Sequence, residues 1–400
     1  MKLQSVKELD EKYIVQSYGR YDLCLTEGRG CRVWDTEGNE YLDLLAGIAV
    51  NVLGHAHPRL SHAISEQAKK LIHVSNLYYI ESQVELAKLL SDISPIEGGK
   101  AFFCNSGAEA NEAAIKFARK HTGRHTIIAM KGSFHGRTMG SIAITGSHRE
   151  KYQTPFEPVM PDVKFVEYGD IEDLKGNIND GTAAVFVETI QGEGGVRIPG
   201  GNKEGAWEYL NSVRDLCSRN GAMMVVDEVQ TGNGRTGKFF ACQHFGIKPD
   251  IITMAKGIAG GVPMGVTLVS GEVANSIHPG DHASTFGGNP LACEAAKAVV
   301  DTILEEGLLE NAEAVGKYLM DQVKAIKSKH IREVRGLGLM VGVELEAEGT
   351  AKKAKEAMQE RGFLLNVTSE TVLRFVPPLI LTKADVDSAV DNLAEVLKGI

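Results

Sequence analysis

The sequence lacks the features that mark several large classes of protein. Its six cysteines are scattered, with no C-x-x-C pair and no cysteine–histidine cluster at metal-ligand spacing, so we expect no metal site. We expect the cysteines to be buried, reduced thiols. No apolar run approaches the length of a membrane span, and no low-complexity tract or internal repeat interrupts the chain.

Excess positive charge is also missing. The net charge of −9 is spread along the chain, which disfavours nucleic acid or an anionic membrane as a partner and favours small molecules. The first twenty residues carry acids early and lack the apolar core of a secretory signal, so we expect a cytoplasmic protein.

The 400 residues exceed what one hydrophobic core usually supports, so we expect a large domain and a smaller one. Residues 31–44 predict two short strands around a turn at Gly38-Asn39. From about residue 60 to 295, amphipathic helices alternate with the apolar runs KAFFCN, TIIAM, AAVFVE, AMMVVDE and DIITMA. This alternation predicts an α/β fold with a mostly parallel central sheet, helices on both faces, and ligands beyond the strands' carboxyl ends.

A glycine-rich run matches two nucleotide-binding motifs. Gly232 to Gly237 fits the dinucleotide fingerprint, and Gly232 to Lys238 fits a phosphate loop as far as its lysine. Phe239 stands where a phosphate loop needs serine or threonine, and the nearest acid for a ribose, Asp250, precedes a strand instead of ending one. Both interpretations are disfavoured, although a nicotinamide-dependent dehydrogenase stays an alternative.

Two charged residues follow apolar strands and point to different chemistry. Asp227 follows Met223–Val226, and Lys256 follows DIITMA, so both side chains should emerge at the ligand-facing edge. Pyridoxal 5′-phosphate (PLP) requires such a pair, namely a lysine for the Schiff base and a carboxylate beside the pyridine nitrogen. A strand-end salt bridge explains the pair equally well.

A candidate phosphate site favours the PLP interpretation. In AFFCNSGAEANEAAIKFARK, a strand runs into Asn105-Ser106-Gly107-Ala108 and then a helix, whose small first residues expose backbone N–H groups to an anion. Ser106 and Glu109 also form a capping-box pattern, which leaves other first-turn donors free.

The chain resembles the class-III (ornithine-type) aminotransferases of fold-type I over essentially its whole length. The ordered motifs are GIAVNVLGHAHP, FFCNSGAEANEAAIKFAR, GSFHGRT, ETIQGEGG, DEVQTGNGRTG, AKGIAGGVPMG, HASTFGGNP and RGLGLMVG. The resemblance implies an N-terminal segment of the small domain (1–50), a large PLP-binding domain (51–295) and a C-terminal small domain (296–400), so that both chain ends build the smaller α+β domain.

The resemblance also implies roles for individual residues. Lys256 would be the Schiff-base lysine and catalytic base, and Asp227 would hold the proton on the pyridine nitrogen. Ala108 and Thr189 depart from the family's usual residues. Ser106, Gly107 and Ala108 would contact the phosphate, Phe134 would stack on the ring, and Gln230 would lie near the ring hydroxyl. The family forms obligate homodimers, in which Thr285 would contact the phosphate of the neighbouring subunit. Arg137 and Ser284 would bind the substrate.

Relatives in this family suggest a switch between two substrates. Glu193 would pair with Arg374 while the amine donor is bound and release it to the second carboxylate of glutamate or 2-oxoglutarate. A permanent inter-domain salt bridge is the alternative.

The N-terminal segment is similar to the acetylornithine branch of the family. Ile48 supports this, because ornithine-specific relatives typically carry tyrosine there, whereas an acylated amine needs an apolar neighbour. The resemblance therefore implies transfer of an amino group from N-acetyl-L-ornithine to 2-oxoglutarate, giving N-acetyl-L-glutamate 5-semialdehyde and L-glutamate, in arginine biosynthesis. N-succinyldiaminopimelate, succinylornithine and 4-aminobutyrate remain alternative substrates, and a catalytically silent relative remains an alternative function.

Overall fold

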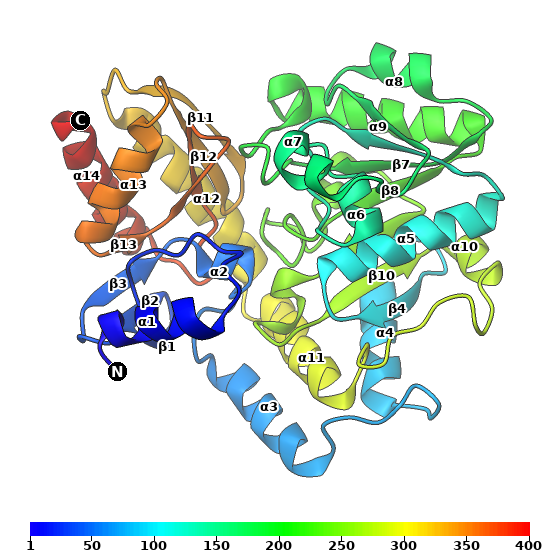
Figure 1. Cartoon of the computed structure of the whole chain (residues 1–400), viewed down its shortest axis with the longest axis horizontal. Coiled ribbons are helices and arrows are strands. Elements are labelled where there is room, and N and C mark those ends of the chain that lie inside the picture. Colours follow the sequence, from blue (N-terminus) through cyan, green and yellow to red (C-terminus); the bar gives the residue numbers. More distant parts are fainter.

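The computed structural model describes residues 1–400, which form three sheets (Figure 1). The largest has seven strands in the order β4-β10-β9-β8-β7-β5-β6. Its neighbours pair in parallel, except that β10 is antiparallel to both β4 and β9. The strands are β4 (Lys100–Cys104), β5 (Thr126–Met130), β6 (Val163–Val166), β7 (Thr182–Glu188), β8 (Met223–Asp227), β9 (Ile251–Met254) and β10 (Gly265–Val269).

Helices cover both faces of this sheet because successive strand residues point in opposite directions. On β8, Val225 belongs to the buried cluster of helix α5 (Gly107–Thr122), whereas Met224 and Val226 belong to the cluster of helix α9 (Lys203–Asn220). All seven residues of β7 are buried. The predicted α/β architecture is therefore confirmed, including strands that read as unbroken apolar runs.

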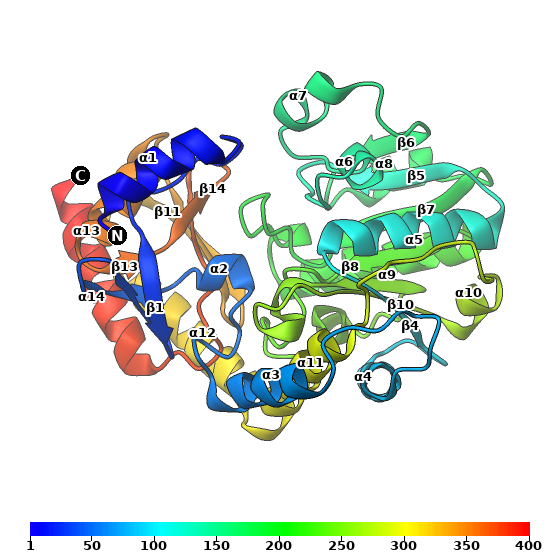
Figure 2. The ribbon, with the colours of Figure 1, turned by 60° about the horizontal axis from the view of Figure 1, so that its bottom comes forward.

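The two ends of the chain meet in the smaller part of the molecule (Figures 1 and 2). Strand β3 pairs in parallel with β13, so Leu42 lies beside Phe363. The predicted hairpin around Gly38 is confirmed as β2 and β3. The strands of the two small sheets are β1 (Leu25–Arg29), β2 (Arg32–Asp35), β3 (Glu40–Asp43) and β13 (Phe363–Leu364), and β11 (Ile331–Leu337), β12 (Met340–Leu345), β15 (Val372–Phe375) and β14 (Asn366–Thr368).

The remaining helices connect and cover these sheets. They are α1 (Leu3–Tyr13), α2 (Ala46–Ala49), α3 (Pro58–Lys70), α4 (Glu81–Ile93), α6 (Met139–Ala143), α7 (Arg149–Tyr152), α8 (Ile171–Asn177), α10 (Gly271–Asn275), α11 (Pro290–Glu305), α12 (Leu308–Ala325), α13 (Thr350–Glu360) and α14 (Lys383–Gly399), with 3₁₀ turns η1 (Thr154–Phe156), η2 (Pro199–Gly201), η3 (Ala241–Phe245) and η4 (Lys256–Ala259). Helix α11 runs through residue 295, so the boundary expected there falls inside a helix; the domain limits stay a prediction. No helix combines the length and apolar composition that a membrane crossing requires.

Segment α2 is an unusual turn. Ala46, Gly47, Ile48 and Ala49 all have positive φ, between 51° and 64°. Such a left-handed turn strains residues that carry a β-carbon, and a β-branched isoleucine most of all. Ile48 is nevertheless 40% exposed, so burial of its side chain does not explain the strain.

Candidate active site

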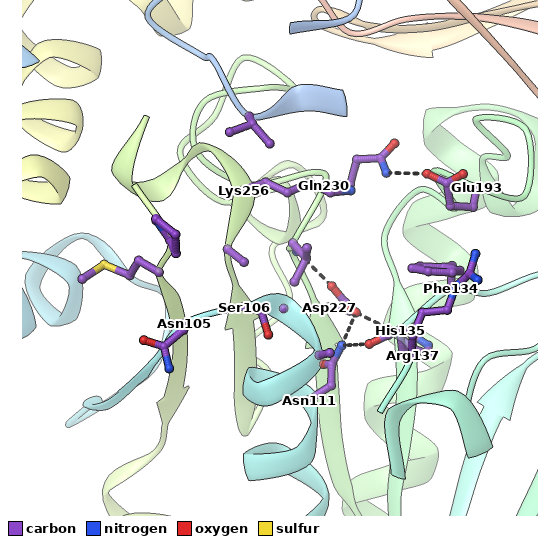
Figure 3. Close-up of a pocket in the computed structure, with 18 of the residues that line it drawn as sticks. Asn105, Ser106, Asn111, Phe134, His135, Arg137, Glu193, Asp227, Gln230 and Lys256 are labelled. Atoms are coloured by element: carbon purple, nitrogen blue, oxygen red, sulfur yellow. Dashed lines mark hydrogen bonds and ion pairs between the residues drawn. The ribbon is translucent and has the colours of Figure 1, made fainter. Parts of the chain in front are cut away.

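A cavity of about 420 Å³ lies at the carboxyl edge of the large sheet (Figure 3). Strands β4, β5, β7, β8 and β9 end at this edge, as parallel strands must. The segments that follow them supply most of the lining, and Val50 and residues 261–264 supply the rest. The predicted site residues on its walls are Ser106, Gly107, Ala108, Phe134, Arg137, Glu193, Asp227, Gln230 and Lys256.

Asp227 is the last residue of β8 and is only 4% exposed. Its Oδ1 accepts the backbone N–H of Val229 at 2.9 Å. Its Oδ2 accepts Asn111 Nδ2 at 2.8 Å and faces His135 Nδ1 at 2.7 Å (Figure 3). The carboxylate is thus fixed at the floor of the cavity.

The two partners of Asp227 are themselves held in place. Asn111 also donates to the backbone oxygen of His135, and its Oδ1 accepts the hydroxyl of Thr253. Burial favours the neutral imidazole, but the hydrogen bond and charge of Asp227 outweigh it and raise the pKa of His135. Nε2 of His135 is buried without a partner.

Lys256 lies directly after β9 and Ala255, at the start of η4. Its φ is +49°, a conformation that costs energy for a residue with a side chain. Burial lowers the pKa of Lys256, although the charge of Glu193 opposes this shift. A lowered pKa increases the fraction of neutral amine, which is the nucleophilic form.

The start of α5 forms one wall of the cavity. Ser106 caps the helix, because its Oγ accepts the backbone N–H of Glu109 at 3.2 Å. The carboxylate of Glu109 bonds the N–H of Asn105 instead of that of Ser106, so only half of the expected capping box forms. Glycine is required at 107, where a β-carbon would lie 2.9 Å from Val229. First-turn N–H groups at Gly107 and Ala108 have no acceptor within the helix.

Phe134 and Arg137 lie on the loop after β5, on the wall of the cavity beside Asp227 (Figure 3). The guanidinium of Arg137 lies over the ring of Tyr152, 4.0 Å from its centre, and 5.6 Å from the centre of the Phe134 ring. These contacts hold an exposed arginine at the cavity wall.

Arg374 lies on β15, is fully buried and does not itself line the cavity. Its Nη1 donates to Glu193 Oε1 at 2.6 Å and to Gln230 Oε1 at 3.0 Å. Gln230 Nε2 in turn donates to Glu193 at 3.3 Å. Burial favours a neutral Glu193, but the charge of Arg374 overcomes it and lowers the pKa of Glu193. The expected ion pair is therefore present, and it also engages Gln230.

Ser284 and Thr285 lie beside this cavity, in an adjoining hollow. Ser284 Oγ accepts Asn105 Nδ2 at 3.2 Å, which links the two hollows. Thr285 is exposed, and it has no contact with the first cavity within this chain.

The glycine-rich run at residues 232–237 is a structural connection and not a nucleotide site. Residues 232–237 form consecutive turns after β8 with no helix opening from them, so the context of a dinucleotide site is absent. Arg235 of this run is fully buried and donates to the backbone oxygens of Leu339 and Pro377. The run therefore joins the large sheet's edge to the part of the chain that carries Arg374.

Sequence comparison decides the family. The model of aminotransferase class-III matches residues 13–397, nearly the whole chain. The chain belongs to the class-III aminotransferases. This transaminase is 50% identical to the acetylornithine aminotransferase of Methanopyrus kandleri, over 98% of its own length and 99% of the relative's. It is 46% identical to that of Synechocystis, over 97% and 92%.

Solved structures confirm the predicted aminotransferase fold. The acetylornithine aminotransferase of Elizabethkingia anophelis superposes with a TM-score of 0.88 at 33% identity, covering 100% of this transaminase and 99% of that chain. The ornithine aminotransferase of Toxoplasma gondii, whose active site holds PLP at partial occupancy, gives a TM-score of 0.93 at 30% identity, covering 100% and 95%.

Three residues of the site were missed from the sequence. Glu188 ends a buried strand as Asp227 does, so the same signal was available. Asn111 is a polar residue on the apolar face of α5, which was also a readable signal. For His135, no sequence pattern shows that it contacts Asp227.

Proposed function

We propose that this class-III aminotransferase uses PLP to transfer the terminal amino group of N-acetyl-L-ornithine to 2-oxoglutarate. The products are N-acetyl-L-glutamate 5-semialdehyde and L-glutamate, in arginine biosynthesis. The full-length similarity to acetylornithine aminotransferases, at 46–50% identity, carries the choice of substrate. These relatives do not favour N-succinyldiaminopimelate, succinylornithine or 4-aminobutyrate, which were the alternatives.

The cavity fits PLP. Its volume of about 420 Å³ suits a small cofactor. Backbone donors at Gly107 and Ala108 suit a phosphate, the ring of Phe134 suits stacking, and the buried carboxylate of Asp227 suits a protonated pyridine nitrogen. When bound, PLP supplies an aldehyde that condenses with amines and a ring that accepts electrons from the adjacent carbon.

Lys256 serves as both anchor and base. Its Nζ would hold the cofactor, and its neutral amine would move the proton from the carbon that bears the substrate's amino group. Asp227 holds the proton of the pyridine nitrogen, and His135 and Asn111 keep its carboxylate in position. A carboxylate about 4 Å from a positive charge contributes about 4 kcal/mol at an effective dielectric of 20, which is roughly three pKa units.

Substrate recognition is assigned to three charged groups. Arg137 binds a carboxylate at the cavity wall, since a guanidinium matches that planar anion. Arg374 and Glu193 accommodate the two substrates in turn, and Ser284 contributes a hydroxyl. Ile48 offers an apolar, 40% exposed side chain on the left-handed turn, which suits an acylated amine better than a charged one.

We further propose a homodimer in which Thr285 contacts the phosphate in the second copy. Several large apolar side chains beside it are exposed: Leu77 at 86%, Tyr78 at 67% and Phe286 at 59%. Leu77 and Thr285 line the same hollow. Exposed apolar surface of this kind favours burial against another subunit. Sedimentation equilibrium tests this, and a monomer at micromolar concentration would contradict it.

A panel of amino donors with 2-oxoglutarate tests the proposed function. We expect a yellow protein that bleaches with borohydride and forms glutamate fastest from N-acetylornithine. Faster transfer from any of the alternative donors would refute the substrate, and a colourless protein that takes up no PLP would refute the chemistry.

A further inference from the structure

A second acid lies at the sheet edge beside Asp227 and has no role in the proposed reaction. Glu188 is the last residue of β7 and pairs directly with Asp227 across the parallel strands. Neighbouring strands lie about 4.8 Å apart. Glu188 is 5% exposed and lines the cavity.

The carboxylate of Glu188 connects two loops that carry other site residues. Its Oε2 accepts the backbone N–H of Phe134 at 3.2 Å. Its Oε1 accepts the backbone N–H of Gly192, next to Glu193, also at 3.2 Å. One side chain therefore joins the wall that presents the Phe134 ring to the wall that presents the Glu193 carboxylate.

Charged and titratable groups from several neighbouring elements act on Glu188. Asp227 faces it from β8, His135 from the loop after β5, and Lys256 from the end of β9. The Tyr168 hydroxyl donates to the backbone oxygen of Glu188 at 2.9 Å. Burial raises the pKa of Glu188 to about 7; His135 opposes the shift and Asp227 adds to it.

We propose that Glu188 is a positioning residue that fixes the Phe134 loop and the Glu193 loop relative to Asp227. This proposal rests on the proposed function, because that function gives Phe134 and Glu193 their roles. The two hydrogen bonds of Glu188 are observed in the chain itself, whatever it binds. Only an ionised carboxylate offers two good acceptors, because a protonated carboxyl turns one oxygen into a donor. The bridge should therefore tighten as the pH rises through neutrality.

The chain contains a matched control in Glu228. It is fully buried one residue after Asp227. Its oxygens likewise accept two backbone N–H groups, from Ala241 at 2.9 Å and Cys242 at 2.8 Å, but it does not line the cavity. Glu228→Gln thus disturbs a buried carboxylate of the same kind without touching either loop.

Hydrogen exchange in the cofactor-free protein tests the bridge directly. Glutamine keeps one acceptor oxygen, so in Glu188→Gln at least one of the amides of Phe134 and Gly192 should exchange faster than in the wild type, whereas Glu228→Gln should leave both unchanged. Glu188→Asp keeps the charge but has a shorter side chain, so both amides should exchange faster in this variant. Equal exchange in all four proteins, or equal acceleration in both glutamine variants, would overturn the proposal.

PLP affinity, measured by fluorescence quenching across pH 5.5–8.5, gives the second readout. Because the loops are looser before binding, PLP affinity in Glu188→Gln should fall by about 2- to 12-fold, the equivalent of one ordinary hydrogen bond. Wild type and Glu228→Gln should gain affinity as pH rises through about 7, and Glu188→Gln should lack that component. An identical pH profile in Glu188→Gln would refute the proposal. Failure of transfer with an intact exchange pattern would refute the proposed function alone.

Discussion

Replacing Arg374 with alanine separates a substrate switch from a permanent salt bridge. The guanidinium is buried and donates to Glu193, Gln230 and, through Nε at 3.2 Å, Asn366. If Arg374 leaves Glu193 to bind the second carboxylate of 2-oxoglutarate, its loss should affect that substrate selectively. N-acetylornithine has no second carboxylate and should react at nearly the normal rate.

The expected size of the effect follows from the charged hydrogen bond that alanine cannot make to 2-oxoglutarate. A hydrogen bond to a charged group contributes about 1.5–3 kcal/mol, which corresponds to roughly 10–150-fold in rate at ~1.36 kcal/mol per decade. In the variant, Glu193 also remains as an unpaired charge that repels a carboxylate. Its side chain is 31% exposed, so hydration limits that repulsion. The decrease in the 2-oxoglutarate half-reaction should stay within this range.

Single-turnover kinetics of the two half-reactions provide the assay. Arg335→Ala is the matched control, because Arg335 also reaches from the small sheet to the Glu193 loop, donating to Gly195 at 2.7 Å, yet it does not line the cavity. That control should affect both half-reactions alike. Glu193→Gln should favour dicarboxylates and disfavour the amine donor. Equal decreases with both substrates in Arg374→Ala would refute the switch and support the permanent bridge.

Three further changes give separate tests. Lys256→Ala should abolish turnover, whereas the control Lys238→Ala should stay active. In the wild type, peptide mapping after borohydride reduction should find the cofactor on Lys256. Because burial lowers the pKa of Lys256 below 10.5, the cofactor-free wild type should lose stability relative to Lys256→Ala as pH falls below 10.5; parallel pH–stability curves in denaturant would contradict this. Asp227→Ala should still bind PLP, but its half-reaction should be severely slowed. A near-normal rate of proton abstraction in stopped flow would instead support the interpretation of Asp227 as part of a strand-end salt bridge. Ile48→Gly should raise the free energy of unfolding by about 1 kcal/mol, because glycine relieves the strain of the left-handed turn. If a urea titration shows a lower free energy of unfolding, the isoleucine side chain contributes more to stability than its strained backbone costs.

The sequence was sufficient to place Asp227 and Lys256, because a charged residue at the end of an apolar run must emerge at the carboxyl edge of a parallel sheet. It did not show that β10 runs antiparallel, since an unbroken apolar run such as GVTLV carries no sign of direction. Contacts between side chains that are far apart in the sequence could not be predicted either. The contact of His135 with Asp227 joins segments that only the folded chain brings together. Positive φ at Lys256 was equally unreadable, because lysine has no preference for that conformation.

The paired strands β3 and β13 are synthesised at widely separated times. Leu42 leaves the ribosome about 320 residues before its partner Phe363, which is roughly 15–60 s at ~5–20 residues per second. During that interval the N-terminal hairpin has an unpaired strand edge, and such edges associate readily with other chains. The strands of the seven-stranded sheet lie entirely between these two segments, so all of them are synthesised before β13. Yield in cells should therefore depend on how well that early edge is shielded.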